Sequence, residues 1–121
     1  AVNQGVTIEF VITSENGPYL GAVGLNQTDT VNRRANLGYW VRSSVTRQNV
    51  ATRAVGLVRE WAFQNTGLLR LEIVIAAGNV ASYRVAEKSG ASREGVLKNR
   101  LMLHGAIRDA TMFSITRDMP A

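Results

Sequence analysis

The strongest pattern in this sequence is a run of apolar residues at helical spacing that begins at Val50. These residues recur at three- and four-residue intervals, which places them on one face of an α-helix: Val50, Ala54, Leu57, Val58, Trp61 and Ala62. The other face carries Arg53, Arg59, Glu60 and Gln64, and Gly67 is a stop signal. We therefore expect one helix here that buries a single face.

Strand-like segments lie on both sides of this helix. β-Branched, aromatic and other apolar residues favour strands at 6–13, 19–27, 35–41 and 69–76, and the last of these has the continuous apolar character of a central strand. Asn79 can cap a second helix that ends near Ser89 and Gly90, and the remainder is typical of a long antiparallel hairpin around residues 104–106.

The predicted order is thus β-β-β-α-β-α-β-β. This is an α+β fold in which a mixed, mostly antiparallel sheet of about six strands carries two main helices. A chain of 121 residues with 45% hydrophobic residues is about one domain long and can bury a core, so residues 1–121 are expected to form a single domain.

Charge and composition limit the partners. Fourteen Lys and Arg against nine Asp and Glu give a net charge of +5, which suits nucleic acid, an anionic membrane surface or a phosphorylated ligand. The chain has no Cys and a single His104, so we expect no metal site. No apolar run approaches the roughly 20 residues that span a bilayer and no signal opens the chain, so we expect a cytoplasmic protein with no membrane partner. Ala1 is not an initiator Met, which indicates a processed chain or a piece of something longer.

The start of the Val50 helix is unusual. A helix start collects unpaired backbone N–H groups and the positive end of the helix dipole, and it normally attracts an acidic side chain. None occurs in this first turn, and Arg47 and Arg53 lie beside it. The site is therefore open to an external anion such as a phosphate, although a solvated helix start with two surface arginines is the simpler alternative.

A sequence motif in the C-terminal part indicates a family. The segment Asn79 to Asp118 resembles the C-terminal half of GNAT-superfamily N-acetyltransferases, in the RimJ/RimL-like branch that acetylates ribosomal-protein N-termini. The resemblance is carried by Asn79, Ala81, Ser82, Arg84, Val85, Glu87, Lys88 and Gly90, followed by Arg93, Glu94 and Gly95. It extends over nearly the whole chain from Gly5, with residues 35–41 as the family's fourth strand. Nothing matches the family's first strand and first two helices.

The resemblance implies that the anion is the pyrophosphate of acetyl-coenzyme A. The family's pyrophosphate loop corresponds to residues 46–51, where Thr46 and Asn49 replace a basic or amide residue and a Gly. Asn tolerates left-handed backbone geometry better than most residues, so this loop can still aim its N–H groups inward.

The cofactor-binding residues that the resemblance implies come from three segments. In residues 38–41 the backbone of Tyr39, Trp40 and Val41 would pair with pantetheine. In the loop and helix start they are Arg47, Gln48, Asn49, Val50, Ala51 and Thr52. In the second helix they are Asn79 on the pantetheine arm, Ser82, and Tyr83 and Arg84 at the adenosine phosphate end. Trp40 as a core ring and Tyr83 and Arg84 on a solvated helix face are the alternatives.

The resemblance also implies direct acetyl transfer to an amine in a ternary complex, with coenzyme A as product. The family's Tyr that protonates the thiolate corresponds to Ala86, so that role passes to Ser82 as in the ribosomal branch; alternatively, Ser82 only caps or packs locally. The usual Glu before the Gly-Tyr pair is Asn36, an amide that cannot take a proton. Glu9, Asp29 and Glu72 are possible general bases acting through water.

Two other function classes remain open. A non-catalytic GNAT-like domain that binds coenzyme A or a partner would explain the departures at Thr46, Asn49 and Asn36. A nucleic-acid-binding module would explain the basic charge, but its arginines should gather on one face, whereas here they are scattered, so we expect no nucleic-acid partner. For the enzyme, the amine acceptor is a protein N-terminus or a small molecule.

Absence of the family's N-terminal segment has a predicted consequence. The strand at residues 6–13 should present an unpaired edge together with an apolar sheet face, and the strands rich in Leu101, Met102, Leu103, Met112, Phe113 and Ile115 offer a second adhesive edge. We therefore expect a homodimer or higher oligomer, unless a preceding segment of the full gene covers this edge.

Overall fold

The computed structural model of the protein describes residues 7–13, 17, 19–42 and 49–118. The elements follow the predicted order: β1 (Ile8–Thr13), β2 (Tyr19–Asp29), β3 (Arg34–Val41), α1 (Val50–Asn65), β4 (Arg70–Ala76), α2 (Val80–Lys88), β5 (Ser92–Leu103) and β6 (Ala106–Thr116). The predicted α+β class, six-stranded sheet and two main helices are confirmed, and the bounds differ from the predicted ones by no more than two residues.

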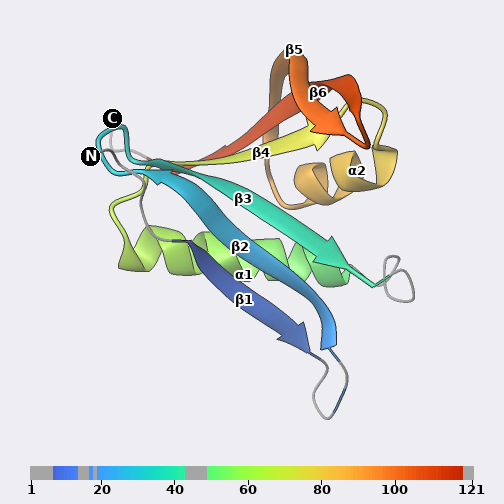
Figure 1. The fold of residues 1–121 in the computed structure, drawn as a ribbon. Helices are drawn as coiled ribbons and strands as arrows, with labels where there is room; N and C mark the ends of the chain where they lie inside the picture. The colour runs from blue at the N-terminus through green and yellow to red at the C-terminus, as the bar shows by residue number, and fades with distance from the viewer. Residues whose placement is uncertain (1–6, 14–16, 18, 43–48, 119–121) are drawn as a thin grey trace.

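The strands form one sheet in the order β1-β2-β3-β4-β6-β5. Neighbours are antiparallel except β3 and β4, which are parallel because α1 carries the chain back between them. Figure 1 shows α1 running along the β1–β3 part of the sheet and α2 lying beside β4. Neither helix in the described part of the chain has the length and apolar character needed to cross a membrane.

One core cluster joins both helices to the sheet. Alternate residues of β4, namely Leu71, Ile73 and Ile75, turn toward the helices, as do Phe113 and Ile115 of β6. From the helices this cluster includes Ala54, Val55, Val58, Ala62 and Ala86. Alternate residues of the strands thus pack against residues at helical spacing on α1 and α2, and together they form a single apolar layer.

The buried stripe of α1 differs from the expected one. Leu57 is wrong as a buried residue, since it is 68% exposed, whereas Ala51 and Val55 are buried. Ala51, Val55, Val58 and Ala62 follow one another at four-, three- and four-residue steps, so the buried face is centred between them and Leu57 lies outside it. The side chain of Leu57 instead lines a groove of about 790 Å³ between β1 and α1.

The end of α1 also differs from the expected stop at Gly67. The helix ends at Asn65, and Thr66 is the C-cap. Thr66 donates both its backbone N–H and its Oγ1 hydroxyl to the carbonyl oxygen of Ala62, at 3.0 and 2.6 Å. A side chain that satisfies a terminal carbonyl can therefore end the helix two residues before the glycine.

The sheet divides at the parallel pair. β3 and β4 pair only through Arg34 with Arg70, Ala35 with Leu71 and Asn36 with Glu72. Beyond these pairs β3 runs on to Val41 and β4 to Ala76 without further pairing, and Figure 1 shows the two strands diverging into a V. The two strands are therefore splayed beyond the pair of Asn36 with Glu72.

The sheet face opposite the helices is polar at its centre, which makes the expectation of an apolar face wrong there. Asn36 Nδ2 donates to Asn26 Oδ1 at 3.0 Å, and Arg70, Glu72 and Ser114 lie on the same face. The reason is strand alternation: the residues of β4 that alternate with the buried Leu71, Ile73 and Ile75 must point the other way, and two of them are Arg70 and Glu72.

Candidate functional site

The divergence of β3 and β4 leaves a narrow slot of about 160 Å³. Its walls come from three elements that are distant in sequence: Leu37, Gly38 and Tyr39 of β3, residues 73–76 of β4, and Asn79 and Ser82 at the start of α2. Three of the predicted site residues, Tyr39, Asn79 and Ser82, are therefore brought together in one cleft.

The main chain of β3 presents hydrogen-bonding groups to this slot. On its other side β3 pairs with β2, and the Arg42 N–H donates to the Leu20 carbonyl at 2.7 Å. Hydrogen-bonded pairs alternate along an antiparallel ladder, so the Trp40 N–H also faces β2. The N–H and C=O groups of Tyr39 and Val41 then point toward the slot.

The side chain of Trp40 lies on the face opposite the helices. It is 50% exposed and packs edge-on against Tyr19, with ring centroids 5.4 Å apart. The alternative of a core ring is therefore wrong for Trp40.

Tyr39 connects the two walls of the slot. Its hydroxyl donates to the backbone carbonyl of Ser82 at 3.0 Å, and this contact ties β3 to the first turn of α2. Burial raises the pKa of Tyr39 to about 12, because a phenolate is costly to place away from water, and the hydrogen bond to Ser82 offsets this only in part.

Asn79 caps α2 as expected. Its Oδ1 accepts from the Ser82 N–H at 3.3 Å. Among the described residues the Asn79 Nδ2 group has no hydrogen-bond partner, which leaves a donor at the slot wall. The Ser82 hydroxyl, at the slot wall, likewise has no hydrogen bond to the described residues. No contact among these residues therefore supports the alternative that the Ser82 side chain caps the helix.

Tyr83 and Arg84 face different surroundings from Ser82. The Tyr83 hydroxyl lies 2.7 Å from Thr111 Oγ1 and accepts from the Gly78 N–H at 3.0 Å, and the Arg93 guanidinium stacks over its ring at 4.8 Å. These contacts, first that with Thr111, lower the pKa of Tyr83. Arg84 is exposed.

The start of α1 has the geometry expected of an anion site. Asn49 adopts the left-handed conformation with φ 58° and makes no side-chain cap, and the first turn contains no acidic residue. The N–H groups of Val50, Ala51 and Thr52 therefore lack intrahelical partners. Lys88 Nζ donates to Asn49 Oδ1 at 3.3 Å, which brings a cation from α2 to this helix start. The predicted Thr46, Arg47 and Gln48 lie outside the described residues.

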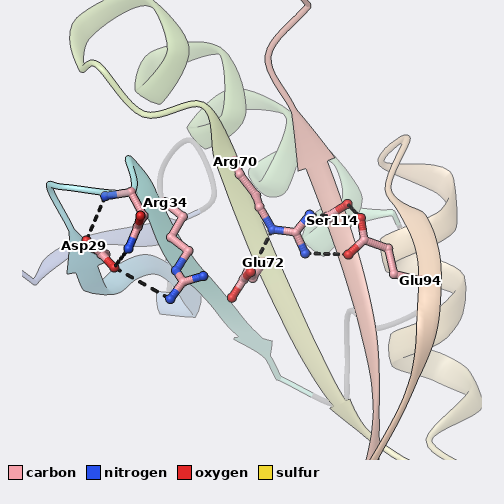
Figure 2. Close-up of polar contacts among 7 residues, drawn as sticks. Asp29, Arg34, Arg70, Glu72, Glu94 and Ser114 are labelled. Atoms are coloured by element: carbon pink, nitrogen blue, oxygen red, sulfur yellow. Dashed lines mark hydrogen bonds and ion pairs between the residues drawn. The ribbon is translucent and has the colours of Figure 1, made fainter.

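Of the three expected general bases, Glu72 lies nearest the slot. It pairs with Asn36 at the last position before β3 and β4 diverge. Glu9 pairs with Gly24, two strands away. Asp29 is the last residue of β2, and its carboxylate accepts from the Val31 and Asn32 N–H groups of the following turn; these bonds, led by that from Asn32, lower the pKa of Asp29. Figure 2 shows Asp29 separated from the Glu72 group.

A charged cluster around Glu72 was missed by the sequence reasoning. Arg70 Nε donates to Glu72 Oε2 at 2.7 Å, while its two terminal nitrogens contact Glu94 of β5. Ser114 Oγ donates to Glu94 at 2.6 Å (Figure 2). Arg70 and Glu72 could have been noticed as charged residues at alternate positions of an apolar strand, but no sequence signal places Glu94 beside them.

Among the described residues no group of three or more His, Cys, Asp or Glu side chains could hold a metal ion. What this region offers is backbone donors at a helix start, a slot with unpaired main-chain groups and, outside the lining of that slot, the Glu72 carboxylate in the last strand pair before the split. This set suits a slender ligand with an anionic end and a reaction that moves a proton.

The tyrosine contact across the slot can be tested at alkaline pH. The folded pKa of Tyr39, about 12, lies above the ordinary tyrosine value of 10.0, so folded protein keeps a proton that the unfolded chain releases between those values. The Tyr39 contribution to stability should therefore fall as pH rises through this window. In Tyr39→Phe this pH-dependent contribution and the last step of a tyrosinate absorbance titration should both be lost, and about 1 kcal/mol of stability should be lost at neutral pH. A last step that persists in Tyr39→Phe would contradict the assignment.

Comparisons with known proteins place the chain in a family. A family model described as the acetyltransferase (GNAT) domain matches residues 1–92. "Putative ribosomal N-acetyltransferase YdaF" of Bacillus subtilis (strain 168) is 31% identical over 101 residues, which cover 84% of this chain and 55% of that protein. The ribosomal-protein-serine acetyltransferase of Escherichia coli (strain K12) is 29% identical over 112 residues, covering 92% and 62%.

Among solved structures, the microcin C7 self immunity acetyltransferase MccE in complex with acetyl-CoA and AMP has a TM-score of 0.83 at 25% identity, and the match covers 92% of this chain and 61% of that one. The chain thus spans only somewhat over half the length of the relatives it matches. The match over residues 1–92, together with the splayed sheet, shows that the chain belongs to the GNAT acetyltransferase domain family.

Proposed function

We propose that this chain is the catalytic part of an acetyl-CoA-dependent N-acetyltransferase, which moves an acetyl group directly to a primary amine in a ternary complex. The observation that carries the proposal is the slot between β3 and β4, with its unpaired main-chain groups, next to a helix start without acidic residues. The alternative is a GNAT-like domain that binds coenzyme A or a partner without turnover.

The cofactor residues would act from two ends of the slot. At the start of α1 the N–H groups of Val50, Ala51 and Thr52, with Arg47 and Gln48 before them, would bind the pyrophosphate; Asn49 gives the turn its left-handed geometry. Lys88, which contacts Asn49, would add positive charge at this end.

Along the slot, pairing with the pantetheine arm was expected from Tyr39, Trp40 and Val41. The ladder alternation favours Tyr39 and Val41 for this role. The free Asn79 Nδ2 would donate from the opposite wall. Tyr83 and Arg84 would lie toward the nucleotide end, where Tyr83 could contribute only its ring because its hydroxyl is already engaged.

The chemistry needs two proton movements. Acetyl-CoA would supply an acetyl group activated as a thioester, whose C–S bond breaks as the amine nitrogen forms the new C–N bond. An ammonium acceptor must first lose a proton, and the second amine proton ends on the departing sulfur. Ser82, at the slot wall, would donate a hydrogen bond there, which suffices because a thiolate is a good leaving group.

Glu72 is the carboxylate that we propose receives the first proton, through water. It pairs with Asn36 in the last strand pair before the split, and only its Oε2 is hydrogen-bonded to the described residues. Asn36 cannot take a proton, but its Oδ1 can accept from an ammonium, since Nδ2 is used by Asn26. The two oxygens together suit a cationic amine.

For the amine acceptor, the names of the relatives support a proposal. A relative named a ribosomal-protein-serine acetyltransferase favours a protein N-terminus, and a small amine remains the alternative. A panel with N-terminal peptides and small amines, assayed for acetylated product, decides between them. Cytoplasmic action is part of the same proposal and is checked by cell fractionation.

The anion site at α1 is tested by placing an acid in it. Thr52→Asp should leave folding unchanged or stabilise it slightly, because carboxylates favour helix starts, yet weaken coenzyme A binding at least about tenfold by repelling the pyrophosphate. Titration calorimetry with coenzyme A and with pantetheine separates the two ends: only coenzyme A binding should fall.

The matched control is Gln64→Asp, which makes the same charge change on an exposed residue of the same helix. It lies 12 residues on, or about 18 Å away, beyond the range of strong charge effects. Equal affinity of the wild type for coenzyme A and pantetheine would remove the pyrophosphate site from the proposal.

Ser82→Ala tests the catalytic residue and the non-catalytic alternative together. If Ser82 assists thiolate departure, turnover of the best amine should fall about tenfold or more while the Kd for coenzyme A changes little. Tight coenzyme A binding with no product from any amine would favour the non-catalytic alternative. Unchanged turnover, with chemistry rate-limiting, would reduce Ser82 to a structural residue.

We also propose that two copies associate through β1. This strand is an edge of the sheet, with Val11 58% exposed, and Leu57 stands at 68% exposure in the groove beside it. Sedimentation at micromolar concentration should show a dimer or higher oligomer, and activity should fall on dilution. Leu57→Lys should shift the distribution to monomer, whereas Val31→Lys, at a 73% exposed position in the turn after β2, should not. A wild type that is already a stable monomer would rule this out.

A further inference from the structure

The Arg70 guanidinium is divided between two carboxylates. Its Nε donates to Glu72 on the same strand, and its two terminal nitrogens face Glu94, which comes from the edge strand β5. Ser114 of β6 holds Glu94 through its hydroxyl at 2.6 Å. Figure 2 shows the four side chains in a row across β4, β6 and β5.

We propose that Glu94 is a positioning residue for acetyl transfer: through Arg70 it leaves Glu72 with one oxygen held and the other without a hydrogen bond to the described residues. This inference rests on the proposed function and deepens it, because it names what keeps the proton acceptor available.

The geometry of the guanidinium explains the effect. An arginine fork pairs most strongly with a carboxylate when two parallel N–H groups meet both oxygens. Here Glu94 takes that two-nitrogen edge, so Glu72 receives only Nε, on Oε2. Without a carboxylate at position 94, the terminal nitrogens are free to turn to Glu72 and engage its second oxygen.

Ser114 and the strand register fix Glu94 in this role. Glu72 and Ser114 are paired across β4 and β6, and Ser92 pairs with the same Ser114 from β5. Paired residues point to the same face, so Ser92, Ser114, Glu72 and Arg70 share one face, and Glu94, two residues after Ser92, lies on it too. The hydroxyl of Ser114 then orients the carboxylate from the middle strand.

The charge state of Glu94 is constant over the range in which an amine would react. The hydrogen bonds from Arg70, and next that from Ser114, lower the pKa of Glu94 from the ordinary glutamate value of 4.5 to about 2. The same pairing raises the pKa of Arg70. Any stability that Glu94 contributes is therefore present above about pH 4.5 and lost as pH falls toward 2. The ion pair between Glu94 and Arg70 thus stays charged near neutrality.

Stability alone is a weak reason for this arrangement. The side chains of Arg70, Glu72 and Glu94 are 28%, 23% and 38% exposed, and ion pairs with this access to water contribute little to folding. An ion pair between Arg70 and Glu94 would by itself link β4 to β5. That link does not require a second carboxylate, Glu72, on Arg70.

A double-mutant cycle tests the inference. Glu94→Gln should lower kcat at least about tenfold with little change in the Kd for coenzyme A, because the open oxygen of Glu72 becomes engaged. In a Glu72→Gln background the same change should cost nothing further, since the group it positions is gone. Glu87→Gln, which removes a carboxylate from a surface pair with Arg93 at 3.6 Å, is the matched control and should leave kcat unchanged.

A second readout needs no turnover. Carbon-detected NMR of the Glu72 carboxyl should show a changed chemical shift in Glu94→Gln and in Ser114→Ala, and none in Glu87→Gln. An unchanged Glu72 signal, or an equal loss of kcat from Glu94→Gln in both backgrounds, would overturn the inference. Failure of the proposed function is distinct, because it appears as absence of acetylated product from the wild type in the amine panel.

Discussion

The separation of β3 from β4 after the Asn36–Glu72 pair is the constraint on which the rest of the structure depends. Two parallel strands that part in mid-sheet leave main-chain N–H and C=O groups without ladder partners, and such groups are costly unless something else satisfies them. Among the described strand pairs, only β3 and β4 leave most of both strands unpaired toward each other, and Asn79 and Ser82 at the start of α2 line the gap. A ligand that supplies hydrogen bonds along its length would complete the interrupted ladder.

The surrounding contacts keep this opening at a fixed width. The hydrogen bond from Tyr39 to the Ser82 carbonyl ties one wall to α2, and Asn79 caps the helix on which Ser82 lies. Below them, Phe113 packs against the ring of Tyr83 and anchors α2 on β6. Because the core residues of β4 continue past the split on the helix side, the opening interrupts the hydrogen-bond ladder without interrupting the apolar layer.

Electrostatics separates the two ends of the slot. The α1 start carries helix-dipole charge, Lys88 and no carboxylate, which suits an anion. The last strand pair before the split carries Glu72 and the amide of Asn36, which suit a cation, and Arg70 is kept from cancelling Glu72 by its stronger pairing with Glu94. The start of α1 thus suits the negatively charged end of a ligand. The carboxylate of Glu72 suits a positively charged amine.

The sequence by itself determined the order of elements, the cap at Asn79, the acid-free start of α1 and the left-handed tolerance of Asn49, because each depends on residues close together in the chain. Its reading of Leu57 as buried failed because an apolar pattern leaves the centre of a helix face uncertain by about one residue, and only packing against the sheet decides it. Tertiary structure alone placed Glu72, and neither Glu9 nor Asp29, in the last strand pair before the split and joined it through Arg70 to Glu94, 22 positions later, since strand register sets which side chains meet. Such pairings follow from the geometry of neighbouring strands, which no local pattern encodes.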